Sequence, residues 1–123
     1  MKSVAVMITT PPLSPLTATS LSIVNELVNN DAVRVTGIFF YQDGVLNASA
    51  SLSMPSDELQ AISQWQQLHQ AHGLPLHLCI TAAEKRGLSD DWQDMNIILP
   101  EFTISGLGEF VTLYSKADQV IQL

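Results

Sequence analysis

Strand-like and helix-like segments alternate about five times along the chain, and this alternation constrains the fold more than any other feature of the sequence. Residues 3–9, "SVAVMIT", form an apolar run rich in β-branched residues, which is the pattern of a strand covered on both faces. Further strand patterns occupy 33–41, 76–80, 102–105 and 117–123. The spacing and capping signals predict a first helix over 15–29 with a cap at Ser14, and a second from a cap at Ser56, with acidic residues at 57 and 58, to about Gly73. Two further helices are predicted over 81–87 and 106–115. For 88–102 we expect a short helix or an ordered loop.

Strands that alternate with helices in this way imply a mostly parallel sheet with helices on both faces. We therefore expect an α/β fold, a flavodoxin-like three-layer sandwich with a mostly parallel five-stranded sheet, in a single domain over 1–123. The terminal segment "ADQVIQL" is predicted to be an edge strand, because Gln119 and Gln122 are polar. In sheets of this kind, functional groups collect beyond the carboxyl ends of the strands.

The charge of the chain disfavours two classes of partner. Five Lys and Arg against twelve Asp and Glu give a net charge of −7, so nucleic acids and anionic membranes should be repelled unless the few cations cluster. The opening "MKSVAVMITTPP" has no long apolar core or cleavage site, and no segment approaches the roughly 20 apolar residues of a membrane span. One cysteine can form neither an internal disulfide nor a CxxC motif. We expect a soluble, cytoplasmic protein.

The sequence predicts neither a cofactor nor a metal. The loop after the first strand, "TTPPLSPL", has no glycine and contains three prolines, which lack the N–H groups that a phosphate cradle needs. His69 and His72 lie three residues apart on one helix and His77 lies near Cys79, but no further residue completes a recognisable set of metal ligands. Solvated histidines near a helix end are the favoured interpretation.

Cys79 is the residue with the clearest chemical potential, and two interpretations are open. A lone cysteine in a domain of this kind is more often inert packing. Its place at the junction of a strand and a helix, however, brings the sulfur near unpaired N–H groups and favours the thiolate. His77 lies roughly 6.6 Å away along the strand, too far for a direct hydrogen bond. Lys85 and Arg86 lie about 9 to 10 Å further along the helix axis. They are therefore expected to interact with the C-terminal end of the helix or with an acidic surface of a partner.

Three blocks, in this order, resemble one known family: "FFYQDGVLNAS", "PSDELQAISQWQQLHQAHGLPLHLCITAAEKRGL" and "FTISGLGEFVTLYSKADQVIQL". They are similar to the DsrE/TusD-like family of sulfur-relay proteins, and the resemblance covers nearly the whole chain. The fold of that family is the flavodoxin-like sandwich that the pattern predicts. Its cysteine stands in the block L-x-x-C-x-x-A-A-x-x-R-G, and Cys79 occupies that position here.

The resemblance implies a sulfurtransferase subunit in which Cys79 carries a persulfide and needs no cofactor. Sulfur would pass from a TusA-like donor to a TusE-like acceptor, and finally into 2-thiouridine at the wobble position of tRNA. The implied assembly is a heterohexamer with TusB- and TusC-like subunits, without direct contact to nucleic acid. Two alternatives remain open: a DsrE-type subunit in sulfur oxidation, or a non-catalytic structural or binding subunit of such a complex.

Tyr41, Gly44 and Asn47 match the block after the second strand, and the resemblance implies that they line the pocket of Cys79. Gly44 is equally explained as a turn residue and Tyr41 as packing. The chain departs from the family at "TTPPLSPL", where members commonly carry a glycine-containing segment with an aromatic residue. We expect this loop to lie beside the cysteine.

Overall fold

A computed structural model describes residues 1–52, 56, 59–88 and 97–123. Five strands form one sheet in the order β4-β3-β2-β1-β5, and every neighbouring pair is parallel. The strands are β1 (Lys2–Ile8), β2 (Val33–Phe40), β3 (Leu76–Cys79), β4 (Phe102–Ser105) and β5 (Gln119–Gln122). The α/β sandwich that the sequence predicts is confirmed, and β5 is an edge strand as expected.

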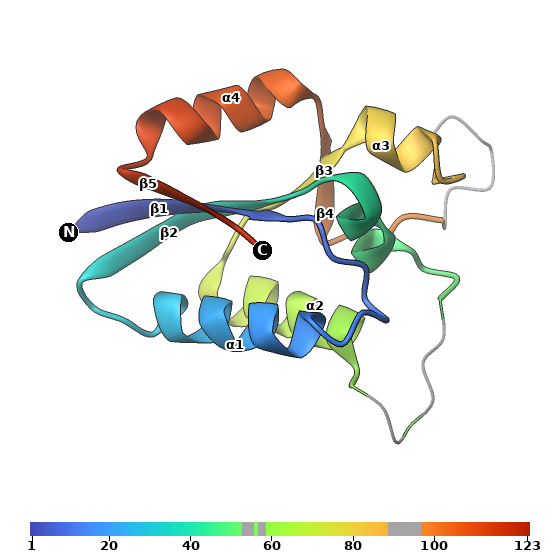
Figure 1. The fold of residues 1–123 in the computed structure, drawn as a ribbon, viewed down its shortest axis with the longest axis horizontal. Helices are drawn as coiled ribbons and strands as arrows, with labels where there is room; N and C mark the ends of the chain where they lie inside the picture. Colours follow the sequence, from blue (N-terminus) through green and yellow to red (C-terminus); the bar gives the residue numbers. More distant parts are fainter. Residues whose placement is uncertain (53–55, 57–58, 89–96) are drawn as a thin grey trace.

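Helices cover both faces of the sheet (Figure 1). The helices are α1 (Thr17–Val28), α2 (Ala61–His72), α3 (Ile80–Glu84) and α4 (Leu107–Lys116). Figure 1 shows α1 and α2 on one face of the sheet and α3 and α4 on the other. A 3₁₀ segment, η1 (Gln42–Ala48), follows β2 where the sequence predicts only a turn. None of the described helices is long and apolar enough for a membrane crossing.

Neighbouring residues of β2 show how the sheet builds its two cores. Side chains alternate between the faces of a strand, so Phe39 and Phe40 point to opposite sides. Phe40 packs edge-on against Trp65 of α2, with ring centroids 5.3 Å apart. Phe39 packs against Phe110 of α4 at 5.0 Å. The apolar run at the end of β2 is therefore the sequence signature of a strand covered on both faces.

Two helices begin later than the sequence predicts. Ser14 is not the cap of α1: its Oγ accepts the N–H of Leu16, and the chain makes a further turn before the helix begins at Thr17. The second helix was expected from Ser56, which instead lies in a turn, and α2 begins at Ala61. The residues 57 and 58 that supported that cap lie outside the described residues.

One helix ends where the sequence predicts, and another ends earlier. Gly73 closes α2 with φ of 62°, a conformation that suits glycine, and its N–H donates to the carbonyl of His69. The helix after β3 is shorter than expected, because α3 ends at Glu84 and Gly87 takes a φ of 79° three residues later. Of the 88–102 segment, 89–96 lie outside the described residues, and Ile98 forms an isolated antiparallel bridge with Ser49.

Candidate functional site

A pocket of about 310 Å³ lies at the carboxyl end of the sheet, where β2 and β3 finish. Its lining comes from the end of β2 and the start of η1, from the junction of β3 and α3 with the turn that follows α3, and from the start of α4. We call it the Cys79 pocket. The described residues that line it are Tyr41, Gln42, Cys79, Thr81, Ala82, Lys85, Arg86 and Leu107.

Cys79 is the last residue of β3 and the residue from which α3 begins. Its backbone is extended, with φ of −68° and ψ of 117°, and the residue is 1% exposed. Because side chains two residues apart share a strand face, Cys79 and His77 both face the side of the sheet that carries α3 and α4. Cys79 is buried and is one of the residues that line the pocket.

Small side chains let α3 begin directly at the end of β3. Ala82 and Ala83 are both buried, so the helix lies close against the sheet and η1. The helix has only five residues, however, so its dipole is smaller than the expected helix over 81–87 would supply.

Lys85 and Arg86 both line the Cys79 pocket. Lys85 keeps helical backbone angles, and its N–H donates to the carbonyl of Thr81 at 3.2 Å. Residues four apart share a helix face, so Lys85 and Arg86 follow Thr81 and Ala82 along the side that lines the pocket. The expected interaction with the C-terminal end of the helix is confirmed for Arg86, whose Nη1 donates to the carbonyl of Ala82 at 3.0 Å. Its Nε donates to Asp43 Oδ1 at 2.9 Å, and this ion pair joins the turn after α3 to η1.

Of the three pocket residues that the family resemblance implies, the structure brings Tyr41 together with Cys79. Gly44 and Asn47 are buried in η1, and neither is among the described residues that line the pocket. A Cβ at Gly44 would lie 2.1 Å from the carbonyl oxygen of Ile8, so only glycine fits this close approach of two backbones. Both residues therefore support the turn beside the pocket.

Asn47 is fully buried, and its amide makes three hydrogen bonds. Its Nδ2 donates to the carbonyls of Thr10, at 3.1 Å, and Gly44, at 2.9 Å. Its Oδ1 accepts the indole N–H of Trp65 at 3.1 Å. This amide ties η1 to the loop after β1 and to α2.

The loop after β1 does not contribute to the Cys79 pocket, contrary to the expectation that it lies beside the cysteine. Thr10 bonds to Asn47 of η1, and no described residue of 9–16 lines the Cys79 pocket. The physical reason is the strand order, because β2 lies between β1 and β3 and η1 follows β2. The loop instead forms a separate hollow of about 300 Å³, to which Leu13 and Leu59 contribute.

His77 is engaged elsewhere than with Cys79. Its Nδ1 lies 3.0 Å from Ser105 Oγ, on the neighbouring strand β4. Burial lowers the pKa of His77, and the Glu109 carboxylate opposes this shift with a smaller effect.

The histidines do not form a metal site among the described residues. The Nδ1 of His69 lies within hydrogen-bond distance, 2.8 Å, of the carbonyl oxygen of Leu74, just after α2. Within the described part of the chain, no three His, Cys, Asp or Glu side chains gather closely enough to hold a metal ion.

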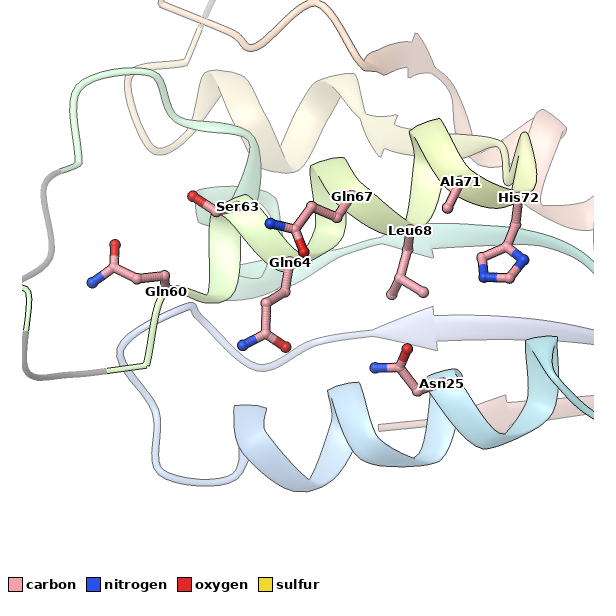
Figure 2. A pocket seen from close by; sticks show the side chains of 8 residues that line it. All are labelled: Asn25, Gln60, Ser63, Gln64, Gln67, Leu68, Ala71 and His72. Atoms are coloured by element: carbon pink, nitrogen blue, oxygen red, sulfur yellow. The ribbon is translucent and has the colours of Figure 1, made fainter.

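A second hollow, of about 440 Å³, lies between α1 and α2 on the opposite face of the sheet (Figure 2). Amide side chains dominate its lining, as Figure 2 shows for Gln64, Gln67 and Asn25. Its described lining offers no thiol and no carboxylate. The Cys79 pocket is therefore the better candidate for chemistry.

The sequence analysis missed four uncharged residues of the described pocket lining: Gln42, Thr81, Ala82 and Leu107. Thr81 lies two residues after Cys79, and its place in the first turn of a helix was predictable from the sequence. Leu107 carried no local signal, because its contribution depends on how α4 packs across β1, β2 and β4.

Comparison with known proteins gives this pocket a context. The model of the DsrE/DsrF-like family matches residues 2–123. The chain belongs to the DsrE/DsrF-like family. It is 33% identical over 124 residues to the protein named Sulfurtransferase TusD in Klebsiella pneumoniae subsp. pneumoniae, a match that covers 96% of this chain and 97% of the relative. The protein of the same name in Salmonella heidelberg matches with the same identity and coverage.

Among solved structures, the crystal structure of the ychN protein from E. coli superposes on this member of the DsrE/DsrF-like family with a TM-score of 0.72. The two chains cover each other completely at 19% sequence identity, so this match supports the fold alone. The resemblance to sulfur-relay proteins that the three sequence blocks indicate is therefore confirmed at the level of the family.

Proposed function

We propose that this protein is a sulfurtransferase subunit in which Cys79 carries sulfane sulfur as a persulfide. The observation that supports this most strongly is the place of the thiol: Cys79 forms part of a pocket wall at the carboxyl end of the sheet. The relatives named Sulfurtransferase TusD, at 33% identity, supply the kind of reaction.

The chemistry needs one thiolate and no cofactor. The Cys79 thiolate attacks the terminal sulfur of the donor persulfide, a new S–S bond forms, and the donor leaves as a thiolate with the electrons of the broken bond. In the second step an acceptor thiolate attacks the terminal sulfur on Cys79, and Cys79 becomes the leaving thiolate. No net oxidation occurs in either step.

In the specific form of the proposal, the donor is a TusA-like carrier and the acceptor is TusE-like, in the cytoplasm. The sulfur finally enters 2-thiouridine at the tRNA wobble position. TusB- and TusC-like subunits complete a heterohexamer, and the chain itself does not bind the tRNA, since its net charge is −7. A role in sulfur oxidation, as a DsrE-type subunit, uses the same persulfide chemistry with other partners.

The burial of Cys79 favours a second candidate, a non-catalytic structural or binding subunit of the same complex. At 1% exposure, the thiol of the isolated chain offers little surface to a partner. The pocket is the route by which a donor sulfur reaches the thiol in the first proposal, whereas the second requires no route.

Transfer of labelled sulfur separates these candidates. The protein is incubated with a persulfide-loaded TusA-like carrier, and label on the chain and on a TusE-like acceptor is measured. Cys79→Ser is expected to abolish both signals, while Ser63→Ala, in the hollow on the opposite face of the sheet, retains them. Undiminished transfer through Cys79→Ser contradicts the proposal and supports the non-catalytic role.

A further inference from the structure

The distribution of positive charge points to an additional substrate for the Cys79 pocket. The chain has only five Lys and Arg against twelve Asp and Glu, yet Lys85 and Arg86 both line this pocket. They are the only charged side chains in its described lining. An anion therefore meets locally favourable charge here, in a protein whose overall charge of −7 repels it.

The two cations differ in how they are engaged. Arg86 is held by the Asp43 carboxylate and by the carbonyl of Ala82. The Lys85 ammonium forms no hydrogen bond or ion pair with another residue that the structure describes. Asp43 offsets the charge of Arg86, so Lys85 supplies the net positive charge of the pocket.

The size and the remaining lining limit the ligand. About 310 Å³ lies at the lower end of the range for small-molecule sites and is too small for a folded domain. Tyr41, Gln42 and Thr81 add hydrogen-bonding groups, and Leu107 adds an apolar contact. A ligand of this size that carries an anionic group fits the pocket beside the thiol.

We propose that the Cys79 pocket also binds a low-molecular-weight persulfide with a carboxylate at its non-reacting end, and that Lys85 holds this carboxylate while Cys79 accepts the terminal sulfur. The inference rests on the proposed persulfide role of Cys79 and adds a small-molecule donor to it. The Cys79 thiolate attacks the terminal sulfur of R–S–SH, the S–S bond of the donor breaks, and R–S⁻ leaves with the bonding electrons. The products are the Cys79 persulfide and a small thiolate, so no oxidant is required.

A matched pair of donors tests the charge directly. The persulfides of N-acetylcysteine and of its methyl ester differ in one carboxylate, and intact-protein mass spectrometry follows the gain of one sulfur atom on Cys79. Each rate is divided by the rate of the same donor with 2-mercaptoethanol, which removes the intrinsic difference in reactivity. We expect the carboxylate donor to load the wild-type chain faster than the ester, although the net charge predicts the opposite order.

Lys85→Gln is expected to slow loading by the carboxylate donor about fivefold, which corresponds to about 1 kcal/mol for two unit charges about 4 Å apart in water. Loading by the ester is expected to stay unchanged, and Lys85→Arg is expected to restore most of the rate. Lys116→Gln removes the same charge at the end of α4, outside the pocket, and serves as the matched control.

Equal loading by both donors, or an equal loss of both rates in Lys85→Gln, overturns the inference. If a persulfide carrier protein loads Cys79 but neither small donor does, the inference fails while the proposed function stands. If neither the carrier protein nor the small donors leave sulfur on Cys79, the proposed function fails and the inference fails with it.

Discussion

Replacing Asn47 by alanine tests whether this residue supports the fold or lines the pocket. The amide is fully buried and joins three segments, through the carbonyls of Thr10 and Gly44 and the indole of Trp65. Asn47→Ala removes all three hydrogen bonds and leaves the buried Trp65 N–H without its acceptor. The structure therefore predicts a large loss of stability and no direct effect on the thiol.

The magnitude follows from the three hydrogen bonds. Each neutral hydrogen bond contributes about 0.5 to 1.5 kcal/mol net, and a buried group left unpaired costs about 1 to 3 kcal/mol. Because Trp65 is fully buried, water does not replace the lost acceptor. We expect the free energy of unfolding to fall by about 3 kcal/mol, which corresponds to a decrease in Tm of about 10 °C for a domain of this size.

Urea denaturation measures the loss, and Asn29→Ala is the matched control. Asn29 is exposed and its amide donates one local bond, to the carbonyl of Asn25, so its removal is expected to cost well under 1 kcal/mol. Persulfide loading of Cys79 is then measured well below the melting transition, where Asn47→Ala is expected to react like the wild type. A stability change below about 1 kcal/mol together with impaired loading would refute this reasoning and indicate that Asn47 acts in the pocket.

Three further predictions concern other parts of the molecule. Gly44→Ala is expected to lower the urea midpoint strongly, because the new Cβ would meet the Ile8 carbonyl. Gly108→Ala is the control and is expected to leave the midpoint nearly unchanged, since its Cβ meets nothing within 4 Å. Similar midpoints for the two variants would contradict the steric argument. Burial lowers the pKa of His77 from its ordinary 6.5, so the unfolded chain binds the proton more readily. Stability is therefore expected to fall as the pH drops from about 6.5 through the folded-state pKa, and urea midpoints should lose this part of the slope in His77→Gln. Val111 of α4 is 61% exposed, so Val111→Glu is expected to change the stability of the isolated chain by less than about 0.5 kcal/mol. The same variant is expected to weaken association with partner subunits, measured by size-exclusion chromatography. Unchanged association would show that this face of α4 is not part of the subunit interface.

The order and type of the elements were predictable because they depend on local patterns. A strand buried on both faces must be apolar throughout, and a covering helix needs an apolar stripe, so β1 and α1 are readable without tertiary contacts. Helix starts were less readable. At Ser14 the capping signal exists, but the hydroxyl caps a turn that precedes the helix. A local signal cannot distinguish these two outcomes, since the same N–H group is satisfied in both.

The site was predictable only in part, because its parts come from distant segments. Cys79 could be located from its position at a strand end, and Tyr41 from the family block. The ion pair between Asp43 and Arg86 joins residues 43 positions apart, and nothing local indicates it. The requirement for glycine at position 44 likewise comes from a distant segment, because a Cβ there would meet the carbonyl oxygen of Ile8 in β1. Pairs of this kind depend on strand order, which periodicity does not specify.

The burial of Cys79 and a role in sulfur transfer are physically compatible. A persulfide on an open surface reacts with any thiol that collides with it, so a relay benefits when only particular molecules reach the sulfur. At 1% exposure, with access from a pocket of about 310 Å³, Cys79 has this kind of protection. The pocket also carries net positive charge, supplied by Lys85, which stabilises an outgoing thiolate. A thiol that was only packing would need the burial but neither the pocket nor its two cations, and this difference is the structural argument for transfer.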